Sequence, residues 1–153
     1  MRAVLQRVSR ASVSVDGEVV GELDRPGLLV YLGVTHDDGP AEVQTTARKI
    51  AGLRLFAPGE EGGERSVLEV GGEVLVVSQF TLYADVRKGR RPSWNAAAPG
   101  PVAEPLVAAV AEALRAEGVG VATGRFGADM EVTIVGDGPV TIVLDVPAVG
   151  SSA

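Results

Sequence analysis

Most of the chain alternates short apolar segments with turn residues, which is a pattern typical of β-strands. Residues 13–15 and 18–20 are two such segments, and they flank Asp16-Gly17, a pair that favours a two-residue hairpin turn. Residues 28–34 (LLVYLGV) and 74–83 (VLVVSQFTLY) are nearly continuous apolar runs. Because such runs are typical of strands covered on both faces, we expect both at the centre of a sheet.

The rest of the strand pattern lies near the end of the chain. Residues 132–135 and 140–146 form another pair of strands, joined by the sequence GDGP. Residues 57–63, with a proline, glycines and acids, predict an exposed and mobile loop. Residues 149–153 predict a flexible tail.

Two stretches have the apolar spacing of amphipathic helices. The first covers about residues 40–52 and the second about residues 102–117. Their apolar faces are Val43, Ala47, Ile50 and Ala51 in the first helix, and Leu106, Val110, Ala113 and Leu114 in the second. Because proline disrupts a helix interior, Pro101 and Pro105 predict that the second helix begins near Glu104.

Strands with two inserted helices favour an α+β fold, with a curved, mostly antiparallel β-sheet or barrel and two main helices. At 153 residues the chain is long enough to bury one substantial core. No linker or repeat divides it. We therefore expect a single domain over residues 1–148, followed by the tail.

The composition narrows the chemistry. The chain has no cysteine, which excludes disulfides, thiolate catalysis and cysteine-based zinc sites. No apolar run approaches about 18 residues, the length of a membrane span, and the first residues lack the pattern of a signal peptide. We expect a cytoplasmic protein that uses no metal and no cofactor and has no membrane partner.

The charge is acidic overall but locally basic. The net charge is −6, from 14 Lys and Arg against 20 Asp and Glu, which argues against a general nucleic-acid binder, and we expect no DNA partner. One cluster contains no acid: Arg87, Lys88, Arg90 and Arg91. We interpret it as a patch that faces the phosphates of RNA, against the alternative of a solvated basic loop.

The chain has one histidine, His36, which follows a strand in a turn-rich acidic stretch. It could act as a general base, but we prefer to interpret it as a solvated turn residue. Asp37 and Asp38 are too close in sequence to complete a convincing metal site with it. No GxSxG, Walker or GxGxxG motif follows a strand.

Two polar segments are unusual for residues that only build a fold. Ser78, Gln79 and Thr81 stand where an apolar strand ends; they mark the edge of a site, or they bond to neighbouring backbone and solvent. The second segment, GDGPVT at residues 136–141, is most simply a turn. It also offers a ligand a bare glycine backbone and a proline, although its residues alone do not predict a cis bond.

Several segments together resemble the D-aminoacyl-tRNA deacylase family, formerly named for D-tyrosyl-tRNA. They are MRAVLQRVSRASVSVDGEVVGEL, GLLVYLGVTHDD, GGEVLVVSQFTLYADVRKGRRPSW with its SQFTL and KG-x-RPS motifs, and FGADMEV followed by GDGPVT. The resemblance covers essentially the whole chain, and its motifs occur in the family's order.

The resemblance implies a homodimeric enzyme that hydrolyses the ester of D-aminoacyl-tRNA in translation quality control. It implies that the SQFT segment of one subunit meets the Gly-Pro loop of the other, and that this loop leaves no room for an L side chain. Because glycine has no side chain to reject, glycyl-tRNA is expected as a second substrate.

The same resemblance assigns roles to residues of this chain. Gly138 and Pro139 would form the cross-subunit Gly-cisPro filter, and Gln79, Phe80 and Thr81 the catalytic segment. The substrate-binding residues would be Ser78, Phe126, Gly127, Met130 and Ala103, and the tRNA contacts Arg87, Lys88, Arg90 and Arg91.

Two mechanisms are open for the hydrolysis. Thr81 could attack as a nucleophile, but no base for it is evident in the sequence. We prefer a mechanism in which the 2′-hydroxyl of the terminal ribose assists, while backbone amides near Phe80 and Thr81 position the ester. One residue departs from the family pattern: Gly136 stands where Asn is common, so either another residue secures the loop or L esters are rejected less strictly.

Two other classes of function compete with this prediction. A non-enzymatic RNA-binding module would keep the basic cluster but would not need both SQFT and GP-x-T. A general esterase for small molecules should show a nucleophile with its base.

Overall fold

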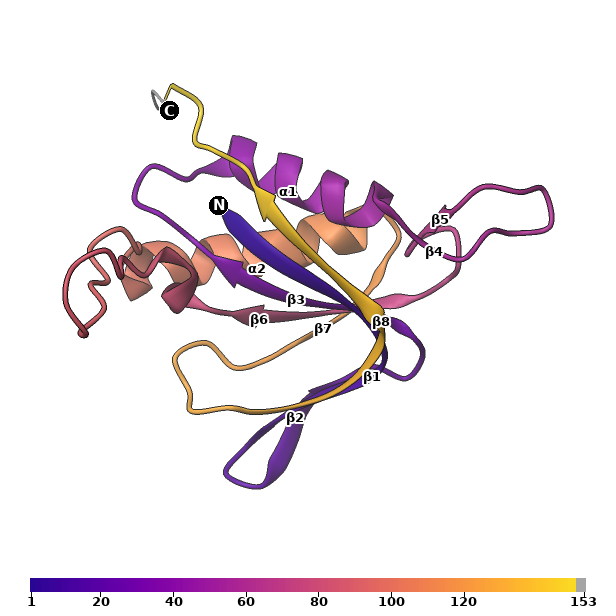
Figure 1. Ribbon diagram of the computed structural model, residues 1–153, viewed down its shortest axis with the longest axis horizontal. Helices are drawn as coiled ribbons and strands as arrows, with labels where there is room; N and C mark the ends of the chain where they lie inside the picture. Colours follow the sequence, from indigo (N-terminus) through magenta and orange to yellow (C-terminus); the bar gives the residue numbers. More distant parts are fainter. Residues whose placement is uncertain (151–153) are drawn as a thin grey trace.

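The structure, a computed structural model, describes residues 1–150 as a strongly curved sheet with two helices packed on one face (Figure 1). In chain order the elements are β1 (Arg2–Val15), β2 (Glu18–Glu22), β3 (Gly27–Gly33), α1 (Pro40–Gly52), β4 (Arg54–Phe56), β5 (Arg65–Ser66), β6 (Glu73–Ser78), the 3₁₀ helix η1 (Phe80–Tyr83), α2 (Gly100–Ala116), β7 (Gly120–Thr123) and β8 (Glu131–Asp145). The predicted α+β fold with two main helices is confirmed.

β1 organises the sheet. It pairs antiparallel with β2 and β3, and also with β8 along almost its whole length. The neighbours β3, β6 and β7 are parallel, because a helix crosses over before each new strand, α1 before β6 and α2 before β7. The sheet is therefore mostly antiparallel, as predicted, with a parallel part that the two helices create.

Two apolar cores lie on opposite faces of the sheet. The first, under the helices, includes Leu5, Leu28, Val30, Ile50, Val76 and Leu114. The second includes Val8, Val13, Leu29, Leu75 and Val77. Because the consecutive residues Leu28 and Leu29 belong to different cores and are both fully buried, β3 is covered on both faces. The central position predicted for this strand and for β6 is confirmed.

The hairpin between β1 and β2 is the one the sequence predicts. Asp16 and Gly17 have φ values of 50° and 80°, the left-handed pair that a type I′ turn requires. The predicted loop at residues 57–63 connects β4 and β5 and is mostly exposed.

The strand predicted over residues 74–83 is too long. β6 ends at Ser78, and the chain turns into η1 after Gln79 donates its backbone N–H to Leu32 O at 2.8 Å. The turn folds back onto Gly33 at the end of β3. A side chain there would meet Gln79 O and Leu82 Cβ, each at 3.1 Å, so a glycine at the end of the neighbouring strand makes room for the change of direction.

The start predicted for the second helix is also wrong. α2 begins at Gly100, not near Glu104. Val102 and Ala103 both donate to Pro99 O at 2.9 Å, so a first turn has formed before Pro105 is reached. Proline at the first or second position lacks only an N–H that would have no partner there, and Pro105 is tolerated inside the helix.

Residues 132–135 and 140–146 are not two strands joined by a turn. Up to Asp145 they belong to one strand, β8, that pairs with β1 along almost its whole length. The GDGP sequence makes an irregularity within it: Gln6 pairs with Thr141 and Val8 with Gly136, so residues 137–140 face a single residue of β1, Arg7. The segment stays in the sheet because the residues of β8 that precede it and those that follow it both pair with β1.

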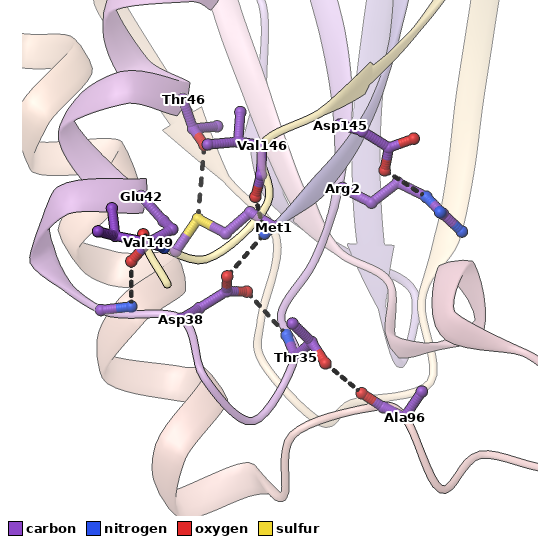
Figure 2. Close-up of polar contacts among 11 residues, drawn as sticks. Met1, Arg2, Thr35, Asp38, Glu42, Thr46, Ala96, Asp145, Val146 and Val149 are labelled. Atoms are coloured by element: carbon purple, nitrogen blue, oxygen red, sulfur yellow. Dashed lines mark hydrogen bonds and ion pairs between the residues drawn. The ribbon is translucent and has the colours of Figure 1, made fainter. Parts of the chain in front are cut away.

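The start of the chain is buried against Asp38 (Figure 2). The Met1 ammonium lies 2.7 Å from Asp38 Oδ1 and 2.6 Å from Val146 O, and both side chains of the ion pair have no exposed surface. The other carboxylate oxygen accepts the Thr35 N–H at 2.8 Å. The predicted tail is tied down at its first residue, where the Val149 N–H donates to Glu42 Oε1 at 2.8 Å; residues 151–153 lie outside the described part of the chain.

Candidate active site

A cavity of about 520 Å³ opens where the parallel strands β3 and β6 end. Its walls come from these strand ends, the first residue of η1, the start of α2 and the loop after β7. The lining residues are Tyr31, Leu32, Val34, Val77, Ser78, Gln79, Phe80, Ala98, Gly100, Ala103, Val107, Phe126, Gly127, Ala128, Asp129, Met130 and Val132. This volume lies within the range of small-molecule sites in proteins.

Seven residues predicted for the site lie around this cavity: Ser78, Gln79, Phe80, Ala103, Phe126, Gly127 and Met130. They come from three segments that are distant in the sequence: the end of β6 with the start of η1, the start of α2, and the loop after β7. The fold places these three segments around one cavity. The structure thus supplies a common location for these residues, while their roles stay predictions.

Thr81 is partly buried and does not line the cavity. Its hydroxyl accepts a hydrogen bond from Gln79 Nε2, and its carbonyl accepts the Ala84 N–H at 3.1 Å. The 3₁₀ turn therefore holds Thr81 from both sides. Its neighbour Phe80, the first residue of the same turn, does line the cavity.

The cavity wall carries little acid–base chemistry. Of its lining residues within the described chain, Tyr31 and Asp129 are ionisable. Burial raises the pKa of Tyr31 above its usual value of 10.0, so its phenol stays neutral near pH 7. Asp129 is exposed. Neither residue was predicted from the sequence. Tyr31 lies within an apolar run and resembles the other strand residues there.

His36 does not line the cavity. It is exposed, and its Nε2 donates to Asn95 O at 2.7 Å, which supports the interpretation as a turn residue. Within residues 1–150, no group of three His, Asp or Glu side chains lies close enough to hold a metal ion. In the same range no helix is long and apolar enough to cross a membrane.

The Gly138-Pro139 peptide bond is cis. Both residues are exposed on β8 and neither lines the cavity of the same chain. A Cβ on Gly138 would lie 2.3 Å from Val140 N, so only glycine fits this position. The preference for a simple turn, drawn from the residues alone, was wrong, and the cis bond that the resemblance implied is present.

Arg7 holds this irregular segment from the side of β1. Its Nε donates to Asp137 O at 3.0 Å and lies 3.3 Å from Asp137 Oδ2, and its Nη1 donates to Leu55 O at 2.6 Å. Sequence reasoning missed Arg7, because nothing local marks which residue of β1 faces the segment. Gly136 itself makes no close approach: a Cβ there would meet nothing within 4 Å.

The four basic residues of the predicted tRNA contact are exposed in the loop after η1. The loop is closed at its base by two hydrogen bonds between Asp85 and Ser93, at 2.8 and 2.9 Å. Arg87 differs from the others, since its guanidinium bonds both carboxylate oxygens of Asp85, at 2.8 and 2.6 Å. This contact lowers the pKa of Asp85 to about 2, so the charge of Arg87 is compensated at neutral pH.

These features define an α+β protein with a substrate-sized cavity beside a 3₁₀ turn and an exposed cis-proline segment on an edge strand. The model of the D-Tyr-tRNA(Tyr) deacylase family matches residues 4–145, and the chain belongs to that family of hydrolases.

Curated relatives agree with this assignment. The chain is similar to the D-aminoacyl-tRNA deacylase of Kineococcus radiotolerans, with 68% identity over 145 residues, covering 95% of this chain and 99% of the relative. It is similar to that of Thermobifida fusca, with 60% identity over 146 residues, covering 95% and 100%.

Two solved structures share the fold. One, titled c-Myc DNA Unwinding Element Binding Protein, has 42% sequence identity and a TM-score of 0.87, covering 97% of this chain and 100% of that chain. The other is described as a probable eukaryotic D-amino acid tRNA deacylase; at 18% identity and a TM-score of 0.80, covering 95% and 98%, it supports the fold alone.

Proposed function

We propose that this protein hydrolyses the ester of D-aminoacyl-tRNA in the cavity beside η1, releasing the amino acid and the tRNA. One observation carries the proposal: Ser78, Gln79 and Phe80 line the same cavity as Phe126 and Met130. A cavity of about 520 Å³ is large enough for a terminal nucleoside with its amino acid.

The site is completed by a second copy of the chain. The cis Gly138-Pro139 segment is exposed and does not line the cavity of its own subunit, so it reaches a cavity only across a dimer. β8 is a long edge strand with exposed apolar residues, among them Ile134, Val135 and Val143. Such edges invite pairing with another chain, which supports a homodimer formed along β8.

Chirality is read by exclusion. D and L esters carry the same groups, so a site that only attracts them discriminates poorly, whereas steric blocking of the L side chain discriminates strongly. Gly138 and Pro139 act as this filter, with their carbonyl oxygens held toward the substrate ammonium. Glycyl esters have no side chain to block and pass the filter, which makes glycyl-tRNA the second substrate.

The chemistry uses the substrate and the protein backbone. The first N–H groups of a helical turn have no partner within it, so the amides of Phe80 and Thr81 are available for the oxyanion of the ester. The Thr81 hydroxyl accepts a hydrogen bond from Gln79, and no carboxylate, histidine or lysine of residues 1–150 is hydrogen-bonded to it. The 2′-hydroxyl of the terminal ribose therefore assists the attack of water on the ester.

Residues 1–148 form the one domain that carries out this reaction, and the protein acts in the cytoplasm.

The proposal is tested by incubating the protein with D-tyrosyl-tRNA and with L-tyrosyl-tRNA and following release of the amino acid. We expect fast release from the D ester and little from the L ester. Absence of turnover of the D ester, or equal turnover of both, would falsify the proposed function. The first result would favour an RNA-binding module and the second a general esterase.

A further inference from the structure

Two large aromatic side chains stand exposed beside the cavity. Phe80 is 57% and Trp94 is 42% exposed, and their rings meet edge to face with centroids 5.3 Å apart. Phe80 also lines the cavity, whereas Trp94 contacts Phe80 without lining it, so Trp94 lies beside the cavity wall. Contiguous exposed aromatic surface on a protein commonly marks a binding site.

The turn that carries Trp94 is fixed to the body of the protein. Three hydrogen bonds join it to the segment after β3: His36 Nε2 to Asn95 O (2.7 Å), Thr35 Oγ1 to Ala96 O (2.6 Å) and Ala98 N to Val34 O (2.9 Å). The bond from Ala97 N to Trp94 O (3.0 Å) closes the turn itself. A surface held in this way loses little conformational entropy when a ligand docks on it. These bonds also give His36 a structural task.

Cations without acidic partners lie in the loop that connects Phe80 to Trp94 along the chain. The loop of residues 86–92 is closed by the pair Asp85 and Ser93, so its base is one residue from Trp94. No acid of residues 1–150 lies within ion-pair distance of Lys88, Arg90 or Arg91, whereas Arg87 is paired. The surface therefore combines fixed aromatic rings with uncompensated positive charge.

That combination suits single-stranded nucleic acid. Bases stack on aromatic faces, while adjacent cations follow the phosphates. An apolar peptide would use the rings but not the cations, and an acidic peptide would use the cations but not the rings. A short unpaired RNA strand uses both.

We propose that Trp94, supported by Phe80, is a stacking site for the base of the unpaired nucleotide that precedes the terminal nucleoside of the substrate. This inference rests on the proposed function, because it takes the terminal nucleoside and its ester to fill the cavity that Phe80 lines. Stacking tolerates every base, so the site strengthens binding of any aminoacylated RNA end and does not select among tRNAs.

The kinetic test compares two substrates that differ only in the preceding nucleotides: D-tyrosyl-tRNA and D-tyrosyl-adenosine. For Trp94→Ala we expect the ratio of kcat/KM on the tRNA to kcat/KM on the nucleoside to fall about tenfold, through KM. Trp94→Phe should restore most of the ratio, because a phenyl ring still stacks. The matched control is Val86→Ala, which trims an exposed apolar residue in the neighbouring loop and should leave the ratio as in the wild type.

A binding test uses the intrinsic fluorescence of Trp94, the one tryptophan of the chain. A hairpin RNA with an unpaired 3′ end should quench it, and the same hairpin with a flush end should not. The stacking site would be overturned if Trp94→Ala lowered kcat/KM equally on both substrates. It would also be overturned if the fluorescence of Trp94 stayed unchanged while anisotropy measurements showed that the RNA with the unpaired 3′ end was bound. Failure of the wild type to hydrolyse D-tyrosyl-tRNA would instead overturn the proposed function, so the two failures are distinguishable.

Discussion

The guanidinium of Arg7 donates a hydrogen bond of 3.0 Å to the carbonyl oxygen of Asp137, the residue that precedes Gly138. This contact holds the irregular segment of β8 from the neighbouring strand. It also bears on Gly136, the residue at which the sequence was expected to depart from the family pattern. The segment has an anchor in Arg7 that does not depend on a side chain at position 136.

Arg7→Lys should weaken chiral discrimination. Lysine keeps the positive charge but cannot span Leu55 O and Asp137 O with two nitrogen atoms as arginine does. Removal of one charge-assisted hydrogen bond changes an equilibrium constant about tenfold. We therefore expect the ratio of D to L turnover to fall by about that factor. Arg10→Lys, the same change at an exposed residue of β1, is the control. Equal ratios in the two variants would show that Arg7 does not position the filter.

Gly136→Asn should be tolerated and should sharpen discrimination. A Cβ at this position meets nothing within 4 Å, and replacing glycine reduces the freedom of the unfolded chain, which stabilises a protein by about 0.4–1 kcal/mol where the backbone is compatible. We expect a small rise in melting temperature and slower turnover of L-tyrosyl-tRNA. A higher melting temperature with an unchanged D to L ratio would mean that Arg7 already fixes the segment fully.

Thr81→Val separates the two mechanisms of hydrolysis. Valine keeps the branched shape but removes the hydroxyl that Gln79 contacts. If backbone amides and the 2′-hydroxyl carry the reaction, we expect kcat to fall by less than about tenfold, the effect of one hydrogen bond. Removal of a true nucleophile lowers kcat by several orders of magnitude. Single-turnover rates with saturating enzyme, together with a binding measurement, decide between them.

The basic loop should contribute unequally to binding of tRNA. Arg91 has no acidic partner among the described residues, whereas Arg87 is paired with Asp85. Arg91→Gln should therefore weaken binding more than Arg87→Gln. It should also lower the slope of log K against log salt concentration by about one, because the variant neutralises one phosphate fewer. Unchanged binding in both variants would assign the cluster to a solvated loop.

How far the sequence predicts this structure depends on how local each cause is. The turn at Asp16-Gly17 and the two-sided burial of β3 follow from neighbouring residues, and both were predicted. The end of β6 was not predicted, because it depends on Gly33 of another strand. Since Gly33 has no side chain, η1 can pack against its backbone. The continuity of β8 through GDGP was missed for the same reason, since it depends on pairing with β1.

Some residues of the candidate site can be recognised from their neighbours in the sequence, and others cannot. Ser78 and Gln79 stand out locally as polar residues at the end of an apolar strand, and both line the cavity. Trp94 and Arg7 gave no local signal. Their positions follow from tertiary contacts, the first with Phe80 and the second with Asp137.

Asp38→Asn should lower the stability of the fold. Asp38 carries the charge that faces the Met1 ammonium, and both side chains of the pair are fully buried. Removing one partner of a buried ion pair leaves the other uncompensated, at a cost of about 3–5 kcal/mol. Chemical denaturation should show this decrease, and Asp37→Asn, at the exposed neighbouring residue, should show almost none.

An independent change tests the same pair from its other side. A few residues added before Met1 replace the ammonium with an amide N–H, so the extension alone should destabilise the fold by a similar amount. Combined with Asp38→Asn, it should cost much less than the sum of the two, because both changes break one interaction. Additive effects would mean that Asp38 acts through the Thr35 N–H, which its second oxygen accepts at 2.8 Å, and not through Met1.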